Sequence, residues 1–369
     1  EVKKLFRNCR LIGRRFRLAH VVYGPEIIEV ATFRGTGEEE GAEGERRIVD
    51  GRIVRDNVWG TIEEDALRRD FRVNAMYYDI SDFSVRDYVG GMQDLQDRVL
   101  RLIGEPATRY REDPVRMLRA ARLAAKLGFS IDAAAAAPFE ELGPLLAEAA
   151  PARLFDESLK MFLAGHGLKS FRMLEQCGLL KFLFPATARA LRRGDEALRA
   201  LVEQGLANTD ARVVEGKSVT PAFLFAVLLW GEVRDLAHHL VAGGKDANEA
   251  WARAALQVVG EQCQRVAIPR RFTFTMEEIW SLQPRFEQVQ RKKVLRLLAH
   301  PRFRAAFDFL LLREHESPAM RELGLWWDHA QQLPHDTLAA ALPSHGGGGN
   351  EPEPAAAPVR KRRRRKPSA

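Results

Sequence analysis

Two clusters of charged residues between residues 61 and 129 constrain the fold most, one at residues 68–74 and one at residues 111–122. Thr61 is followed three residues later by Glu64, the pairing of a capping box, so a helix is expected to begin at Thr61. Asp113 and Pro114 repeat a helix-start signal, because Asp caps the first backbone amides and Pro suits the first helical position. Strand-like segments lie between the two signals. We therefore expect two helices whose ends bring Arg and Asp side chains together.

The helix predicted after Pro114 carries four cations on one stripe. They recur at spacings of three, three and four residues: Arg116, Arg119, Arg122 and Lys126. A stripe of this kind is usually a face in contact with water. Here a second cluster, Arg68-Arg69-Asp70 with Asn74, ends the helix that begins at Thr61. Arginines bind phosphates, and a carboxylate beside a guanidinium offers an acceptor and a donor edge to a base, so the two clusters suit a nucleotide.

Local patterns predict strands early in the chain and helices later. Gly24-Pro25 predicts the turn of a hairpin, and Gly90-Gly91 predicts a packing turn rather than a phosphate loop. The acidic and Gly-rich composition of residues 35–57 predicts a mobile loop. The expected strands are 10–12, 16–23, 27–33, 77–80, 85–88 and 99–103. From residue 106 onward the apolar spacing is helical.

Two segments resemble the paired motifs of the class II template-independent RNA nucleotidyltransferases. They are Glu64-Asp65-Ala66-x-x-Arg69-Asp70-Phe71-x-x-Asn74 and Arg111-Glu112-Asp113-Pro114-x-Arg116-Met117-x-Arg119-Ala120-x-Arg122. This family comprises bacterial poly(A) polymerases and tRNA CCA-adding enzymes, and the resemblance covers residues 1 to about 330. The blocks LIGRRFRLAHV and RRFTFTMEEIWSLQPRFE look like the poly(A) polymerase branch.

The resemblance implies an α+β fold and a reaction. The fold would be a nucleotidyltransferase head with a small mixed β-sheet, an all-helical neck and body, and a disordered basic tail. We expect the head in residues 1–105, a neck that binds nucleotide and RNA in 106–200, the body in 201–332 and the tail in 333–369. The implied reaction transfers AMP from ATP to an RNA 3′-hydroxyl without a template and releases pyrophosphate, in RNA processing and decay.

Glu29 is the candidate catalytic and metal-binding carboxylate. It lies in the apolar run 27–33, where burying an unpaired carboxylate is costly; a glutamate on an edge strand that faces water is the alternative. In the family this segment holds the third catalytic carboxylate, and an upstream Asp-x-Asp motif holds the other two. No Asp-x-Asp occurs in these 369 residues. Two-metal phosphoryl transfer needs a full carboxylate set, so we expect weak Mg²⁺ binding and weak catalysis, and a natural start before Glu1.

The resemblance also implies which residues bind ATP. Asp70, with Arg69 and Asn74, is expected on the ribose and phosphate side of the nucleotide. Asp70 also stays open as a second catalytic carboxylate. The pair expected to face the base, and the two residues expected to supply charge to the triphosphate, all follow the second helix start: Asp113 and Arg116, then Arg119 and Arg122.

Basic residues interleaved with aromatic ones suit single-stranded RNA, through phosphate contacts and base stacking. Two such clusters occur, at Arg14-Arg15-Phe16 and at Arg270-Arg271-Phe272, although Phe272, Phe274 and Trp280 could equally be core residues. A C-terminal run also suits a polyanion, and its seven cations equal the net charge of +7: Arg360, Lys361, Arg362, Arg363, Arg364, Arg365 and Lys366.

Composition narrows the cellular compartments and the kinds of partner expected for this chain. Three cysteines without metal or disulfide spacing favour a reducing cytoplasm. No run of 18 apolar residues and no signal peptide is present in the sequence, so we expect no membrane partner. The expected partners are RNA 3′ ends, ATP and proteins of RNA decay. Two alternatives stay open: a tRNA CCA-adding nucleotidyltransferase and a catalytically inactive RNA-binding remnant.

Overall fold

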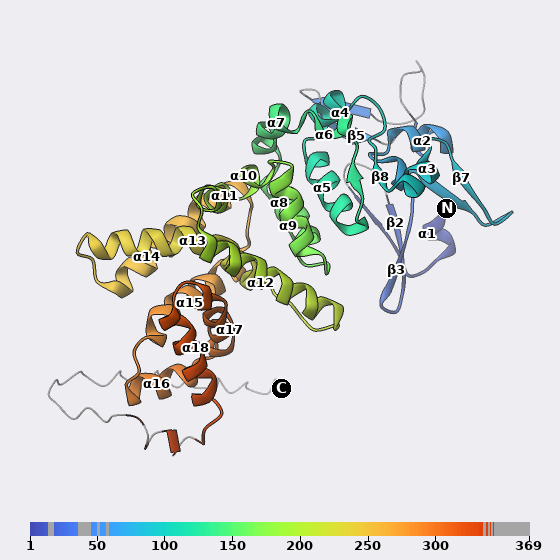
Figure 1. Ribbon diagram of the computed structural model, residues 1–369. Helices are drawn as coiled ribbons and strands as arrows, with labels where there is room; N and C mark the ends of the chain where they lie inside the picture. The colour runs from blue at the N-terminus through green and yellow to red at the C-terminus, as the bar shows by residue number, and fades with distance from the viewer. Residues whose placement is uncertain are drawn as a thin grey trace, which may run out of the picture.

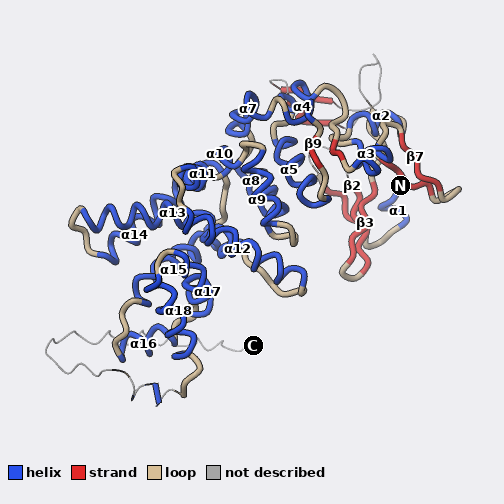
Figure 2. The backbone as a smooth tube through the Cα atoms, viewed as in Figure 1, coloured by secondary structure: helices blue, strands red, loops and turns tan. Residues whose placement is uncertain are grey.

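The computed structural model describes residues 1–13, 18–35, 46–49, 52–56 and 59–334, with single residues at 337, 338, 340 and 342. The strands lie in the first 131 residues, and helices make up the described chain beyond them (Figure 1; Figure 2). This arrangement confirms the expected α+β class. The described strands, however, form four small sheets rather than a single mixed one.

The largest sheet has three antiparallel strands. They are β1 (Cys9–Ile12), β2 (Leu18–Tyr23) and β3 (Glu26–Val30), and they pair in that order. Gly24 turns the chain between β2 and β3 with a φ of +54°, a conformation that glycine adopts at no steric cost. The predicted hairpin is thereby confirmed, and its register sets His20 opposite Glu29.

The prediction of a single loop over residues 35–57 was wrong. β4 (Arg46–Val49) and β5 (Arg52–Asp56) pair antiparallel within it. Asp50-Gly51 stands between their sequences, and Asp-Gly is among the strongest signals for a two-residue hairpin turn. The acidic, Gly-rich stretch before Arg46 obscured this pattern.

Two further pairs of strands complete the described sheets. β6 (Met76–Asp79) and β7 (Ser84–Asp87) form an antiparallel hairpin close to its predicted bounds. β8 (Val99–Leu100) and β9 (Ser130–Ile131) pair in parallel. The strand expected at 99–103 therefore ends early, and Leu102 keeps only an isolated bridge to Phe71.

Short helices connect these strands: α1 (Val2–Leu5), α2 (Ile62–Arg68), the 3-10 turn η1 (Arg72–Asn74) and α3 (Gly91–Asp97). The capping box before α2 is confirmed, because Thr61 and Glu64 exchange side chain-to-backbone hydrogen bonds at 3.2 and 2.6 Å. The Gly90-Gly91 turn begins α3, which the sequence reading missed. The Asp87 carboxylate accepts hydrogen bonds from four backbone amides here, from Val89 to Met92. These donors are therefore engaged by a carboxylate of the chain itself.

The rest of the described chain is a succession of helices. The first group is α4 (Pro106–Glu112), α5 (Val115–Leu127), α6 (Ala133–Ala136), α7 (Phe139–Leu142), η2 (Gly143–Glu148), α8 (Pro151–Phe162), α9 (Gly167–Gln176), α10 (Leu180–Leu183) and α11 (Pro185–Arg192). The second is α12 (Glu196–Val214), α13 (Pro221–Ala242), α14 (Ala247–Arg265), α15 (Arg270–Phe286), α16 (Arg291–Leu298), α17 (Phe303–Leu312), η3 (Arg313–His315) and α18 (Pro318–Ala330). The second helix start, at Asp113-Pro114, is confirmed to within one residue.

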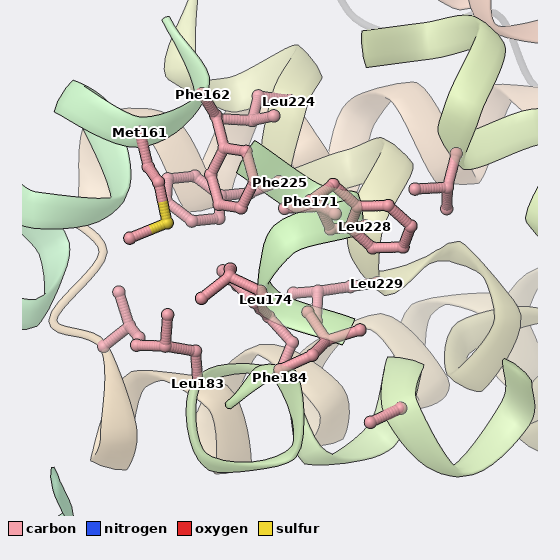
Figure 3. Close-up of a cluster of buried hydrophobic side chains, with 14 of the residues drawn as sticks. Met161, Phe162, Phe171, Leu174, Leu183, Phe184, Leu224, Phe225, Leu228 and Leu229 are labelled. Atoms are coloured by element: carbon pink, nitrogen blue, oxygen red, sulfur yellow. The ribbon is translucent and has the colours of Figure 1, made fainter. Parts of the chain in front are cut away.

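A large hydrophobic core extends across both groups of helices, and a second core lies among α15, α16, α17 and α18. Figure 3 shows Phe162 and Phe171 of α8 and α9 facing Phe225 of α13, with Phe184 beside them. The ring centroids of Phe184 lie 6.1 Å from those of Phe162 and of Phe225. Trp280 is fully buried in the same core, and its indole N–H donates to the carbonyl of Ala226 at 3.1 Å. Because the core is continuous, the predicted boundary at residue 200 stays a prediction.

α13 is the most apolar long helix of the body, and it is buried along most of its length. Its Leu, Val, Phe and Trp side chains pack against α11, α12, α14 and α15. Across the described ranges, no helix combines the length and the apolar character needed to cross a membrane.

The Gly91 position gives a test of the head. A Cβ at Gly91 would lie 2.4 Å from the carbonyl oxygen of Arg72, a backbone atom that cannot move alone. Gly91→Ala should therefore lower the free energy of unfolding by about 2 kcal/mol, as overpacking does. Gly260→Ala is the matched control: this glycine lies inside α14 with open space around it, and Ala should stabilise the helix by about 1 kcal/mol. Urea unfolding of both variants checks the pair, and equal stabilities would contradict the packing at Gly91.

Candidate active site

Asp65 of α2 is the centre of the contacts around Arg69, and the sequence analysis did not single it out. Its side chain is only 5% exposed and accepts a 2.7 Å hydrogen bond from the Tyr77 hydroxyl. Its two oxygens also lie 3.2 Å from Arg34 and from Arg69. Burial pushes the pKa of Asp65 up, but the Tyr77 hydroxyl and the two guanidiniums outweigh it, so the pKa lies below its usual value. Asp65 thus ties the chain after β3 to α2 and β6.

Arg69, one of the predicted nucleotide-binding residues, is held in this cluster. Besides Asp65, its guanidinium donates to the Tyr77 hydroxyl at 3.0 Å and to the backbone carbonyl of Asn74 at 3.2 Å. Burial and the hydrogen bond to Asp65 raise the pKa of Tyr77 to about 12, so its hydroxyl keeps the proton it donates. The structure therefore brings Arg69 and Asn74 together, as expected, and fixes the direction of the guanidinium.

The Asp70 side chain contacts the helical neck rather than the residues around Asp65. One carboxylate oxygen lies 2.5 Å from Arg119 of α5, and the other accepts the backbone amide of Phe71 at 2.9 Å. The Arg119 side chain is 40% exposed, so part of its guanidinium still faces solvent. The pair joins the end of α2 to α5, and it places a residue from each predicted cluster in contact.

Arg109 makes a second link between head and neck, and the sequence reading missed it. From α4, its guanidinium donates to the carbonyls of Arg68 and Arg69 at 2.9 and 2.7 Å. These carbonyls belong to the C-terminal end of α2, where helical carbonyls have no partner of their own. Burial, with the nearby charge of Arg116, lowers the pKa of Arg109. Arg109 lies one helical turn before Asp113, and this spacing was the sequence signal that could have identified it.

The predicted base-facing pair lies where α4 meets α5. Arg116 donates to the Glu112 carboxylate at 2.8 Å and to the carbonyl of Arg109 at 2.7 Å. Asp113 instead accepts a 2.8 Å bond from Arg153 of α8. Burial raises the pKa of Asp113, but Arg153 and Arg116 outweigh it, so the pKa lies below its usual value. Both side chains are therefore held from two sides, by partners that the sequence did not reveal.

The cation stripe of α5 is not a row of free charges. Arg116, Arg119 and Arg122 reach three different acids, Glu112, Asp70 and Glu157 respectively. Arg122 lies 2.5 Å from Glu157 of α8, and both side chains are largely buried. The helical spacing correctly placed these arginines on one face, but Arg122 lies between α5 and α8 rather than at an open surface.

Glu29 lies on an exposed edge strand. All five residues of β3 are exposed, the Glu29 side chain by 61%, and its carboxylate pairs with His20 at 3.0 Å. This geometry matches the water-facing alternative. Among the described residues, no group of three or more His, Cys, Asp or Glu side chains could hold a metal ion. One carboxylate beside one imidazole does not fit Mg²⁺, which prefers six oxygen ligands.

The RNA-contact candidates are only partly within the described chain. Arg270 and Arg271 are exposed at the start of α15, and Arg271 lies over the ring of Phe272 at 4.7 Å. Phe272 itself packs against the core, whereas Phe274 is exposed. Arg14, Arg15 and the basic run 360–366 lie outside the described residues.

The Asp65 centre predicts a pH-dependent loss of stability. Asp65→Asn keeps the side-chain shape but removes the charge that pairs with Arg34 and Arg69, so the unfolding free energy at pH 7 should fall by about 3 kcal/mol. Because folding lowers the pKa of Asp65, its carboxylate stabilises the fold above the unfolded pKa of about 3.9, and this contribution is lost as pH falls through the folded pKa. Chemical unfolding at pH 7 and pH 3 checks this; a difference between the two proteins that stays constant with pH would contradict it.

Comparison with known proteins identifies the family. Three family models match: the poly A polymerase head domain over residues 1–101, the probable RNA and SrmB-binding site of polymerase A over 128–191, and the polymerase A arginine-rich C-terminus over 243–368. Poly(A) polymerase I of Salmonella typhi is 49% identical over 339 residues, which are 90% of this chain and 72% of that protein.

The CCA-adding enzymes are more distant. The enzyme of Lactobacillus helveticus is 31% identical over 173 residues, 47% of this chain and 41% of that enzyme. The structure of the Thermotoga maritima CCA-adding enzyme complexed with tRNA matches 90% of this chain and 70% of that one, with a TM-score of 0.58 and 20% identity. That likeness concerns the fold alone, whereas the match to poly(A) polymerase I extends along nearly the whole sequence. The chain therefore belongs to the bacterial poly(A) polymerase family of nucleotidyltransferases.

Proposed function

We propose that this chain is a polynucleotide adenylyltransferase, which adds AMP from ATP to RNA 3′ ends without a template. One observation carries the proposal within this family. The two Arg-Asp clusters are joined across the head and neck by the Asp70–Arg119 pair and by Arg109. We name the joined residues the head–neck cluster: Asp65, Arg69, Asp70, Arg109, Glu112, Asp113, Arg116 and Arg119.

The head side of the cluster suits the sugar and phosphates of ATP. We assign Arg69, Asp70 and Asn74 to the ribose and phosphate side, where charged donors are oriented before the ligand arrives. Arg119 supplies charge to the triphosphate from its exposed edge. Arg122 acts on the triphosphate only through its field, because its guanidinium is engaged by Glu157.

The neck side suits the base. Without a template strand, protein side chains must supply the hydrogen-bonding edge that selects adenine. Adenine presents an amino donor and ring-nitrogen acceptors, which match a carboxylate and a guanidinium. Asp113 and Arg116 provide that pair. Because Glu112 and the carbonyl of Arg109 hold Arg116, its remaining donors have a fixed direction, and this preorganisation favours one base over others.

The family implies Mg²⁺, and the described residues do not complete a site for it. Glu29 is our candidate for one ligand, with Asp70 as the second carboxylate to be tested. Asp70 is engaged by Arg119, and Glu29 is paired with His20. We therefore expect weak Mg²⁺ binding and weak AMP addition by this chain, and we ascribe no step of the reaction to the metal.

RNA contacts and partners lie farther along the chain. We assign RNA binding to Arg270 and Arg271, to Arg14 and Arg15, and to the basic run 360–366. The family model that matches residues 128–191 is described as a probable RNA and SrmB-binding site, which supports RNA binding and a protein partner there. Three free cysteines support a reducing, cytoplasmic setting.

A nucleotide-choice assay tests the proposed function. The chain is incubated with Mg²⁺ and either a generic single-stranded RNA or a tRNA truncated at its 3′ end, with each nucleoside triphosphate alone and with CTP and ATP together. The RNA length is followed on a gel, and the binding of RNA and of each nucleotide is measured by calorimetry. We expect slow extension by ATP alone, and tighter binding of ATP than of CTP, GTP or UTP. Addition of CTP and then ATP to a truncated tRNA, followed by a stop, would replace the proposal with the CCA-adding alternative. RNA binding without extension or nucleotide preference would leave the RNA-binding remnant.

Arg116→Ala tests the assignment of the base-facing pair. Losing a charge-assisted contact should weaken ATP binding about tenfold or more and reduce the preference for ATP, measured by calorimetry with all four nucleotides. Arg111→Ala is the matched control, because Arg111 lies on the adjacent helix with a more exposed ion pair, to Glu141 at 3.3 Å. The assignment is wrong if both variants keep the affinities of the unaltered chain.

A further inference from the structure

A groove in the helical body shares no residue with the head–neck cluster. It lies where the C-terminal half of α12, the connection 215–220, the start of α13 and α17 meet, and its volume is about 580 Å³. Cavities of this size hold drug-sized ligands. In Figure 1 the C-terminal end of α12 projects toward the side of the molecule on which the head lies. We call this feature the α12–α17 groove.

Three arginines from two elements line the α12–α17 groove. Arg212 belongs to α12, whereas Arg302 and Arg304 stand at the start of α17. Their partners are few: the carbonyl of Ser218 at 3.1 Å for Arg212, Glu278 at 2.9 Å for Arg302 and Asp308 at 2.8 Å for Arg304. Each guanidinium has five N–H donors, so donors remain for a ligand.

The acids in the lining do not cancel this charge. Glu215 pairs with Lys217 at 2.6 Å, so its carboxylate has a cation of its own outside the lining. Burial raises the pKa of Asp308 despite the opposing effect of Arg304, which weakens its hold on a negative charge. The groove therefore favours an anion, and arginine forks suit the oxygens of a phosphate.

The rest of the lining suits a flat ring with a polar edge. Phe223 and Leu311 supply an apolar wall, and the Phe223 ring is fixed edge-on against Phe309 with centroids 6.1 Å apart. Asn208, Ser218 and Thr220 supply neutral donors and acceptors and are exposed. A ligand with an aromatic base, hydroxyl groups and a phosphate matches all three kinds of wall.

We propose that the α12–α17 groove binds one nucleotide of a single-stranded RNA, upstream of the 3′ end that is being extended. The inference rests on the proposed function, because RNA is then the substrate that the body must hold. A polymer fits the groove better than a free nucleotide, since much of the lining is exposed and leaves room for the continuing strand. A base against an aromatic wall, with arginines on the backbone, is a recurrent mode of single-strand binding.

The test is a double variant, Arg212→Ala with Arg304→Ala, in the full 369-residue chain. Fluorescence anisotropy with a labelled 20-nucleotide oligo(A) should show about tenfold weaker binding, and the slope of log K against log salt should fall by about 1.4, because each lost phosphate contact changes it by about 0.7. ATP binding by the head–neck cluster should not change. Unfolding by urea confirms that the exposed substitutions leave the fold intact.

The single variant Arg304→Ala should also weaken oligo(A) binding, and Arg253→Ala is its matched control, because each replacement removes one charge. Arg253 and Arg304 are both exposed helix arginines, 60% and 72% respectively, and each pairs with an acid four residues away. Arg253 lies on α14, outside the groove lining. Its replacement should leave oligo(A) binding unchanged; an equal loss in both proteins would show that the effect is only that of net charge and would overturn the proposal.

The remaining outcomes also decide the question. Unchanged oligo(A) affinity in the double variant overturns the proposal. Loss of AMP binding without loss of oligo(A) binding would make the groove a mononucleotide site and overturn the RNA assignment. Photo-crosslinking of azidoadenosine-containing oligo(A) to the unaltered chain should label the peptide with Phe223, and labelling elsewhere alone contradicts it. Groove-dependent RNA binding without nucleotide preference would refute the proposed function and keep the groove.

Discussion

The Arg109 guanidinium, seated on the last carbonyls of α2, is the contact on which the geometry of the candidate site depends. A helix leaves its final carbonyls without partners, and here a side chain of another helix takes two of them. The same guanidinium meets Glu112, which also holds Arg116. One residue therefore connects the side of the cluster that we propose for the phosphates to the side that we propose for the base. The Asp70–Arg119 pair repeats the link a short distance away.

The ion pairs of the head–neck cluster fix the positions of its side chains more than they stabilise the fold. Burying charged groups costs desolvation energy, which ion pairing only partly offsets, so a cluster of paired charges contributes little net stability. The stability must come from elsewhere. The continuous core of the neck and body, with Phe162, Phe184 and Phe225 at its centre, supplies the apolar burial that the small head lacks (Figure 3). The head attaches to that core through Phe71, which is fully buried in it next to Asp70.

The sequence predicted local structure well and side-chain partners poorly. Capping signals located the starts of α2 and α5, and the Gly24 turn located the β2–β3 hairpin, because these features depend on neighbouring residues. The hairpin of β4 and β5 was hidden by composition. α3 was missed because its N-cap is a glycine, Gly90, and the carboxylate that accepts its first amides comes from Asp87, three residues before that cap. Helical spacing put the arginines on one face. It could not identify Glu157 as a partner from another helix.

The distribution of paired and unpaired cations separates selectivity from affinity. In the head–neck cluster every arginine has a carboxylate or carbonyl partner, which fixes direction but leaves little free charge. The cations of α15 and α16 differ. Within the described part of the chain, these form no ion pair: Arg271, Arg285, Arg291, Lys292, Lys293 and Arg296. Free cations attract any RNA backbone, in proportion to the counterions released. Under the function we propose, these cations would hold RNA without reading its sequence, and the oriented donors of the head–neck cluster would select the nucleotide.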